Sequence, residues 1–547
     1  MSLSAIPNKL FPVKDIKLFG GDYFGILISI ILFGPVISLF ITALESNHGL
    51  WKHLVETVLG LYVANTIYLF LGVLILTAGL GISCAWFVTN FSFPGRKFLE
   101  WALILPLACP AYIIAYVYTD FLEYAGPVQG LIRGTLGFET AKDYYFPEIR
   151  SIGGAIFVMG FVLYPYVYIL ARTGFSNSPR SLFETASLYG ENKFFRVGLP
   201  LCRPYIVAGL ALVGMEVLSD FGTVEYFSIQ TLTLGIFNVW IGMNSISAAS
   251  QIALITFIFI VLLLFFEIKA RSQQRFSETS KRFNGISHVK LSGPKSFAIS
   301  LFCFIPLFLG FILPVSILFS NVLLGLKDFD FLNIGMVLLN TIILALISTL
   351  IIIILAFFSA NVSHFCSNKL LLVFYNLSAC GYAFPGTMLA VGVVVFIGFV
   401  DSFTGSIIFF SGSFMGIVFA YTVRFYAIPF GTTISGFSRI PRNLFDASST
   451  LGNSQINTAF KITLPLIRSS VLAAAILTFV DIVKELPMTL ILRPFNFETL
   501  STYTYQFAHD ELMIEASLPA FFIILCGLLP IFLVNEVMKG FFHGYKN

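Results

Sequence analysis

Charged side chains are scarce in this sequence. Lys, Arg, Asp and Glu together make up only 11% of the 547 residues, whereas soluble domains contain about a quarter. Apolar residues reach 57%, Phe alone occurs 62 times, and the mean hydropathy is +0.90. This balance excludes an ordinary soluble globule and predicts an integral membrane protein.

Patterns for disulfides, soft metals and nucleotides are also missing. The seven Cys and six His are scattered, without a CxxC pair or a Cys/His spacing typical of a metal site. No G-x-x-x-x-G-K-[ST] phosphate loop occurs, since the nearest fragment, at Gly293, lacks the preceding glycine. We therefore expect a chain that is not an enzyme, binds no cofactor itself and does not hydrolyse ATP. A metal site remains unknown at this level.

Long apolar runs are abundant. A bilayer-spanning helix needs about 20 apolar residues, and twelve runs approach or exceed this length, at 24–43, 63–90, 99–119, 152–171, 204–222, 250–268, 297–319, 338–361, 370–398, 411–430, 466–487 and 518–538. The first run lacks a cleavage site and is expected to be retained. Alternating sides along the chain puts 25 basic residues, among them those of residues 424–468, on the side of the N-terminus and 7 on the other. This bias predicts that both termini are cytoplasmic.

The chain shows an internal duplication. Landmarks recur in the same order, namely Asn65-Thr66 with Asn340-Thr341, Pro110 with Pro385, and PRSLFETASLYG at 179–190 with PRNLFDASSTLG at 441–452. Their offset drifts from 275 to 262 residues, which predicts a longer outer loop around 120–150 in the first half. The expected fold class is an all-α polytopic membrane protein of two tandem six-helix repeats. The repeats are assigned to 1–268 and 297–547, with a basic cytoplasmic linker at 269–296.

The repeated polar stretch predicts a short cytoplasmic helix in each half. Pro179 suits a first helical position, Ser178 before it is a candidate cap, and Gly190 is a natural stop. One alternative is a loop helix that only covers the surface. Two copies on one side of the membrane, each with an acid six residues before its glycine, favour a functional role.

Acid, small residues, Gly and a downstream Leu-Pro together resemble the signature loop of bacterial ABC-importer permeases. In that family the loop forms a coupling helix that seats in the ATPase subunit. The positions that match the signature are Glu184, Ala186, Gly190, Asp446, Ser448 and Gly452. The first copy departs from the pattern, because Gly190 and Pro200 are ten residues apart whereas Gly452 and Pro465 are thirteen apart.

A narrower resemblance covers nearly the whole chain. Segments 215–237 and 483–505, together with the total length, are similar to the fused, double-length permeases of ferric-iron importers. This resemblance implies a bacterial inner-membrane protein in contact with lipid, two copies of an ATPase subunit that use ATP, a periplasmic binding protein, and no nucleic acid. Alternatives are a permease for another small solute such as thiamine, a secondary transporter, and a membrane scaffold that transports nothing.

Two carboxylates recur near the end of the fifth predicted helix of each half. Glu216 matches Asp481, and Asp220 matches Glu485, with an i, i+4 spacing that predicts one helix face. Acids within the membrane are costly, so a solvated cation path is one reading, and hard cations prefer oxygen ligands. The other reading is structural, with Lys484 neutralising Glu485. The hydroxyls of Tyr112, Tyr116 and Tyr118 are further candidate ligands, although aromatic residues in membrane helices mostly serve packing.

Overall fold

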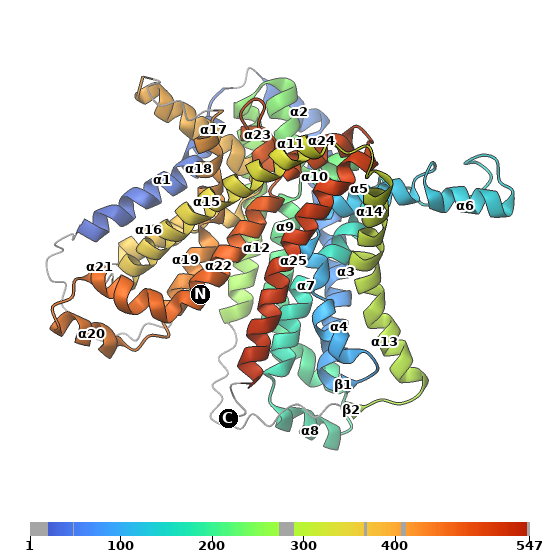
Figure 1. Ribbon diagram of the computed structural model, residues 1–547, viewed down its shortest axis with the longest axis horizontal. Coiled ribbons are helices and arrows are strands. Elements are labelled where there is room, and N and C mark those ends of the chain that lie inside the picture. The colour runs from blue at the N-terminus through green and yellow to red at the C-terminus, as the bar shows by residue number, and fades with distance from the viewer. Residues whose placement is uncertain (1–19, 47–48, 273–288, 366–368, 406–411, 544–547) are drawn as a thin grey trace.

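A computed structural model of the chain describes residues 20–46, 49–272, 289–365, 369–405 and 412–543. Most of these residues are helical (Figure 1), which confirms the all-α class. Ten helices are long and apolar enough to cross a membrane, and two bent helix pairs raise the number to twelve. Within the described ranges, the only strands are β1 (Phe91–Ser92) and β2 (Val289–Lys290), which pair in parallel.

The elements follow one another in two similar series. The first series is α1 (Gly20–Ala43), α2 (Leu50–Thr57), α3 (Leu59–Asn90), α4 (Arg96–Ala102), η1 (Leu105–Ala108), α5 (Ala111–Leu122), α6 (Pro127–Leu136), α7 (Ile152–Ser176), α8 (Arg180–Leu188), η2 (Phe194–Gly198), α9 (Leu199–Ser219), α10 (Gly222–Tyr226), α11 (Leu232–Phe237), η3 (Asn238–Gly242) and α12 (Ile246–Ser272). The second is α13 (Pro294–Leu307), η4 (Phe308–Ile312), α14 (Leu313–Leu324), α15 (Phe331–Phe365), α16 (Lys369–Ser378), η5 (Gly381–Ala383), α17 (Gly386–Phe403), α18 (Phe414–Phe425), α19 (Ala427–Phe437), α20 (Arg442–Thr450), α21 (Gln455–Thr458), η6 (Ala459–Thr463), α22 (Leu464–Lys484), α23 (Pro487–Leu492), α24 (Leu500–His509) and α25 (Met513–His543).

The duplicated landmarks hold equivalent structural positions. Thr66 Oγ1 on α3 accepts the backbone N–H of Leu232, and Thr341 Oγ1 on α15 accepts that of Leu500, at 3.0 and 2.8 Å. The neighbouring Asn side chains also donate to backbone carbonyls, and these carbonyls lie just before the starts of α11 and α24. Each half therefore ties its long second span to a short later helix, α11 or α24, through the same pair of contacts.

The two halves are interleaved. Helix α1 packs on α16 and α17 of the second half, and α13 packs on α3 and α4 of the first. Ser38 Oγ on α1 donates to the carbonyl of Gly392 at 2.9 Å, and Tyr118 Oη donates to that of Leu309 at 2.5 Å. The repeat boundaries remain a prediction, and residues 273–288 of the linker lie outside the described residues.

The third predicted span of each half is broken, so the predictions of single helices at 99–119 and 370–398 are wrong. In the first half, the segments on either side of Pro110 are bent by 91°. In the second half, α16 ends at Ser378 and α17 begins after Pro385. Proline lacks the N–H that would continue a helix and its ring clashes with the preceding turn. Irregular backbone at membrane depth is tolerated where it is enclosed by protein or lines a cavity.

Candidate functional site

A cavity of about 160 Å³ lies where the broken spans of the two halves meet. It is lined by residues beside both breaks of the third span, by the ends of α9 and α22, and by α7 and α18. The volume exceeds the roughly 10–15 Å³ that one water molecule requires, and the lining is polar, so the cavity has room for water. The lining comprises Leu107, Cys109, Pro110, Ala111, Tyr112, Met159, Val162, Leu163, Tyr166, Glu216, Ser219, Asp220, Phe221, Gly222, Tyr382, Arg424, Phe425, Asp481, Lys484, Glu485, Leu486 and Pro487.

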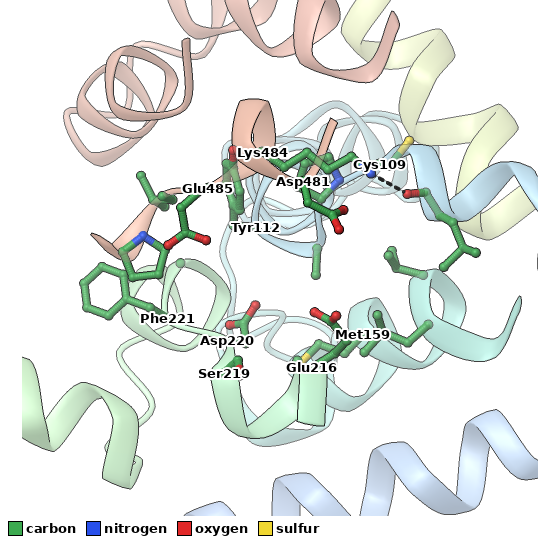
Figure 2. A pocket seen from close by; sticks show the side chains of 18 of the residues that line it. Cys109, Tyr112, Met159, Glu216, Ser219, Asp220, Phe221, Asp481, Lys484 and Glu485 are labelled. Atoms are coloured by element: carbon green, nitrogen blue, oxygen red, sulfur yellow. Dashed lines mark hydrogen bonds between the residues drawn. The ribbon is translucent and has the colours of Figure 1, made fainter. Parts of the chain in front are cut away.

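The structure brings all four predicted path carboxylates to this cavity. Glu216 and Asp220 come from the first half and face Asp481 and Glu485 of the second across an open space (Figure 2). The expected placement on one helix face is wrong, however. Helix α9 ends at Ser219 and α22 ends at Lys484, so the second acid of each pair lies in extended backbone beyond the helix.

That second acid caps the short helix that follows. The carboxylate of Asp220 accepts the N–H groups of Thr223 and Val224 at 3.0 and 3.2 Å. The carboxylate of Glu485 accepts the N–H of Met488 at 3.0 Å. Acids satisfy the free amides at a helix N-terminus and complement its dipole. These two residues therefore have a structural task that the helical interpretation missed.

The first acid of each pair has fewer protein partners. Glu216 Oε1 accepts a long hydrogen bond of 3.4 Å from the hydroxyl of Tyr382. Among the described residues, no hydrogen bond or ion pair to the Asp481 carboxylate meets ordinary distance limits. Both side chains are half-buried and line the cavity. Glu216 and Asp481 are thus the carboxylates with most capacity left for water or a ligand.

Two cations accompany the acids. Arg424 Nη1 on α18 lies 3.3 Å from Glu485 Oε1, and the two side chains are only 12% and 5% exposed. Gly386 lies directly against this pair, where a Cβ atom would collide with the guanidinium. The sequence interpretation had counted Arg424 among the cytoplasmic charges, which is wrong. The sequence feature that could have placed Arg424 in the site is its position inside the apolar run 411–430.

Lys484 does not make the contact expected of it. Its ammonium donates to the carbonyl of Leu107, at the break in the third span of the first half, at 2.9 Å. Arg424 takes the place beside Glu485 instead. Because Lys484 is the last residue of α22, its side chain extends from the second half toward the broken segment of the first (Figure 2).

The three candidate tyrosines lie in different surroundings. Tyr112 lines the cavity, and its hydroxyl is buried with no hydrogen-bond partner in the described part of the chain. Tyr116 lies away from this cavity, and the hydroxyl of Tyr118 binds the carbonyl of Leu309. Tyr166 and Tyr382, which the sequence interpretation did not name, also line the cavity.

The acids surround the cavity without forming a chelating group. Within the described residues, no three His, Cys, Asp or Glu side chains are placed to hold a metal ion together. Four carboxylates and two cations leave a formal lining charge of −2. A net negative lining attracts cations and repels anions.

The two short helices predicted from the repeated polar stretch are present as α8 and α20. Both lie along the lower side of the molecule in Figure 1, whereas α2, α11 and α24 lie along the upper side. Gly190 and Gly452 follow their last turns with φ of 68° and 79°, the left-handed region that glycine adopts without strain. The following N–H groups reach back to Ala186 O at 2.9 Å and Ser448 O at 3.1 Å, as in a helix-ending Schellman turn.

The two helices expose the same positions. Glu184 and Asp446 are exposed, while Ala186 and Ser448 face the protein and are 7% and 2% exposed. The apolar residues two positions before these acids, Leu182 and Leu444, are 42% and 41% exposed. Each helix therefore exposes both an acid and an apolar side chain to its surroundings.

Two local details differ from expectation. Ser178 does not cap α8, because its hydroxyl donates to the carbonyl of Gly174 at 2.9 Å, and Pro179 and Pro441 precede the first helical residue. The three extra residues after Gly452 contribute to α21, a single turn with no counterpart in the first half. A π-helical turn precedes Leu199 and Leu464 in both halves.

Comparison with known proteins agrees with this architecture. Residues 77–276 match the family model described as binding-protein-dependent transport system inner membrane component. The chain is 24% identical to the Fe(3+)-transport system permease protein FbpB 2 of Haemophilus influenzae over 485 residues, covering 87% of this chain and 89% of that relative. The ferric transport system permease protein FbpB of Actinobacillus pleuropneumoniae is 22% identical, covering 86% and 72%. The sulfate transport system permease protein CysW of Escherichia coli is 26% identical, covering 48% and 90%. Residues 77–276 therefore resemble the inner-membrane components of binding-protein-dependent transport systems, and the similarity to Fe(3+)-transport permeases extends over most of the chain.

Proposed function

We propose that this chain is the permease for ferric iron in an ABC importer and that the ion passes through the cavity between the two halves. The observation that carries the proposal is the convergence of Glu216, Asp220, Asp481 and Glu485 on one cavity of about 160 Å³. The names of the two full-length relatives, which are iron permeases, support the same cargo.

The charge of the lining favours a cation over an oxyanion. The half-length relatives include sulfate permeases, whose cargo carries negative charge. With four carboxylates and two cations, the lining has an excess of two negative charges that would repel such a cargo. Attraction to a carboxylate grows in proportion to the charge of the ion, so a trivalent cation gains most from this lining.

The partners follow from the two exposed helices. One ATPase subunit binds at α8 and a second at α20, and a substrate-binding protein delivers the ion at the opposite end. Closure of the ATPase pair moves α8 and α20 together and switches the halves between inward and outward openings. The separate, similarly exposed faces of α8 and α20 support this arrangement.

The orientation proposed is that of a bacterial inner-membrane protein with both termini in the cytoplasm. It is supported by the basic-residue bias and by the position of the end of α25 on the same side as α8 (Figure 1). A cysteine introduced at Ala141 should react with a membrane-impermeant reagent added to cells with a permeabilised outer membrane, whereas one at Asn453 should not. Labelling at 453 in such cells would reverse the orientation.

The decisive experiment removes the charge of the two open carboxylates. Glu216→Gln together with Asp481→Asn keeps shape, and we expect iron uptake by the complete importer to fall by at least about tenfold. Complex yield and ATPase assembly should stay near normal. Glu56→Gln with Asp328→Asn makes the same chemical changes at exposed positions outside the cavity and serves as the control. Wild-type uptake in a well-folded double variant would refute the cation path and leave the permease family intact.

A further inference from the structure

The cavity contains cations from one half only. Lys484 and Arg424 belong to the second half, and their equivalents at the repeat offsets of 265 and 262 residues are Ser219 and Val162. All four of these residues line the cavity. The carboxylates are therefore duplicated while the cations are not, so the cations are a specific addition to the second half.

Of the two cations, Lys484 is held by the weaker set of contacts. The guanidinium of Arg424 is fixed by the buried carboxylate of Glu485 and by the close approach of Gly386. The ammonium of Lys484 has a single hydrogen bond, to the carbonyl of Leu107, among the described residues. It also interacts electrostatically with Asp481 and Glu216, the two open carboxylates. A flexible four-carbon stem lets an ammonium leave such a position without moving the backbone.

A second observation marks this space as a ligand site. Tyr112 is only 6% exposed and lines the cavity, yet its hydroxyl has no hydrogen-bond partner in the part of the chain that the structure describes. A buried hydroxyl without a partner is costly unless a water molecule or a ligand satisfies it. The cavity thus combines acids, a cation held by one hydrogen bond and a tyrosine whose hydroxyl lacks a partner.

We propose, building on the proposed function, that Lys484 is a tethered counter-ion that keeps abundant monovalent and divalent cations out of the empty cavity. An incoming ion must displace the ammonium from the field of Asp481 and Glu216, and this cost is the same for every ion. The attraction that offsets the cost rises with the charge of the ion. A trivalent ion overcomes it, whereas potassium, magnesium or calcium at cellular concentrations does not. Lys484 therefore sets a minimum charge for occupancy.

The test is a titration of the complete importer in lipid nanodiscs with terbium, a hard trivalent ion whose emission nearby tyrosines sensitise. Lys484→Met should bind terbium about tenfold tighter or more than the wild type. Millimolar calcium should displace terbium from Lys484→Met but not from the wild type. Lys484→Arg keeps the charge and should resemble the wild type, and Lys461→Met, which removes an exposed lysine, should do so too. Lys484→Gln supplies a second neutral side chain should the methionine variant fold poorly.

The outcomes separate this inference from the function on which it rests. Glu216→Gln with Asp481→Asn should weaken terbium binding, and unchanged binding in that variant would refute the cation path itself. If that variant weakens binding while Lys484→Met or Lys484→Gln shows wild-type affinity and no calcium sensitivity, the counter-ion role of Lys484 is wrong and the path stands.

Discussion

The two halves of the molecule agree in most of their polar contacts and differ in a few. In both halves a threonine of the second span accepts an N–H from α11 or α24, and an acid caps a short helix. Both halves also have a helix on the lower side that ends in glycine. Only the second carries cations in the cavity. The repeated contacts are those that the fold and the proposed ATPase binding require of each half. The contacts that differ lie around the cavity.

A second difference lies in the loop after the third span. In the first half this loop contains α6, which projects sideways from the helix bundle in Figure 1. The longer loop expected there from the drifting offset is confirmed. Beyond α6, the carboxylate of Asp143 accepts the N–H groups of Thr140 and Glu139 at 2.7 and 3.0 Å. These hydrogen bonds lower the pKa of Asp143.

The largest effect is expected where the halves are most alike. Glu184→Ala with Asp446→Ala removes the exposed acid from both coupling helices, and ATP-driven uptake should be abolished while the chain still inserts. Each single variant should be impaired, with Asp446→Ala affected at least as strongly because the first loop is three residues shorter. Uptake assays and purification of the ATPase complex measure this, and normal uptake by an intact double-variant complex would contradict the coupling role.

A smaller effect should separate the two capping acids. Glu485→Gln leaves the guanidinium of Arg424 buried without its counter-charge, which costs about 3–5 kcal/mol when one partner of a buried pair is removed. Asp220→Asn has no ion pair to lose, and its amide oxygen still accepts from the helix, so about 1 kcal/mol is expected. Thermal unfolding of the purified variants compares them. Equal losses would mean that Arg424 does not depend on Glu485.

The smallest effect tests the symmetry itself. Thr66→Val and Thr341→Val each leave a buried backbone N–H, of Leu232 or Leu500, without its acceptor. Each change should lower stability by roughly 1–3 kcal/mol, and by similar amounts. Thr135→Val, at an exposed position on α6, is the control and should change stability little. A large inequality between the two buried sites would show that one half dominates the stability of the fold.

The repeat, the helix-ending glycines and the four acids could be predicted from the sequence, because each forms a local pattern that occurs in both halves. The helix breaks were less visible. Pro110 and Pro385 served as markers of the repeat, but their effect depends on whether the surrounding protein encloses the irregular backbone. The sequence also did not predict where α9 and α22 end. Asp220 and Glu485 lie beyond these helices because their carboxylates cap the next helix.

The cations show a different limit. Arg424 and Glu485 are separated by 61 residues, and nothing local indicates that they meet. Counting charges by segment assigned Arg424 to the cytoplasm, although an arginine can be retained at membrane depth when it has a partner. The sequence analysis paired Lys484 with Glu485, whereas its ammonium contacts the broken third span of the other half, a contact that no local pattern indicates.

The uneven charge of the cavity bears on why both repeats belong to one polypeptide. Two copies of the first repeat would surround the space with four carboxylates and no cation, whereas two copies of the second would add four cations to four acids. Only one copy of each gives the observed balance. If the two repeats were separate subunits, pairs with one copy of each would form only in competition with homodimers of either repeat. A covalent connection fixes the ratio at synthesis, and the crossing of α1 and α13 between halves completes the assembly within one chain.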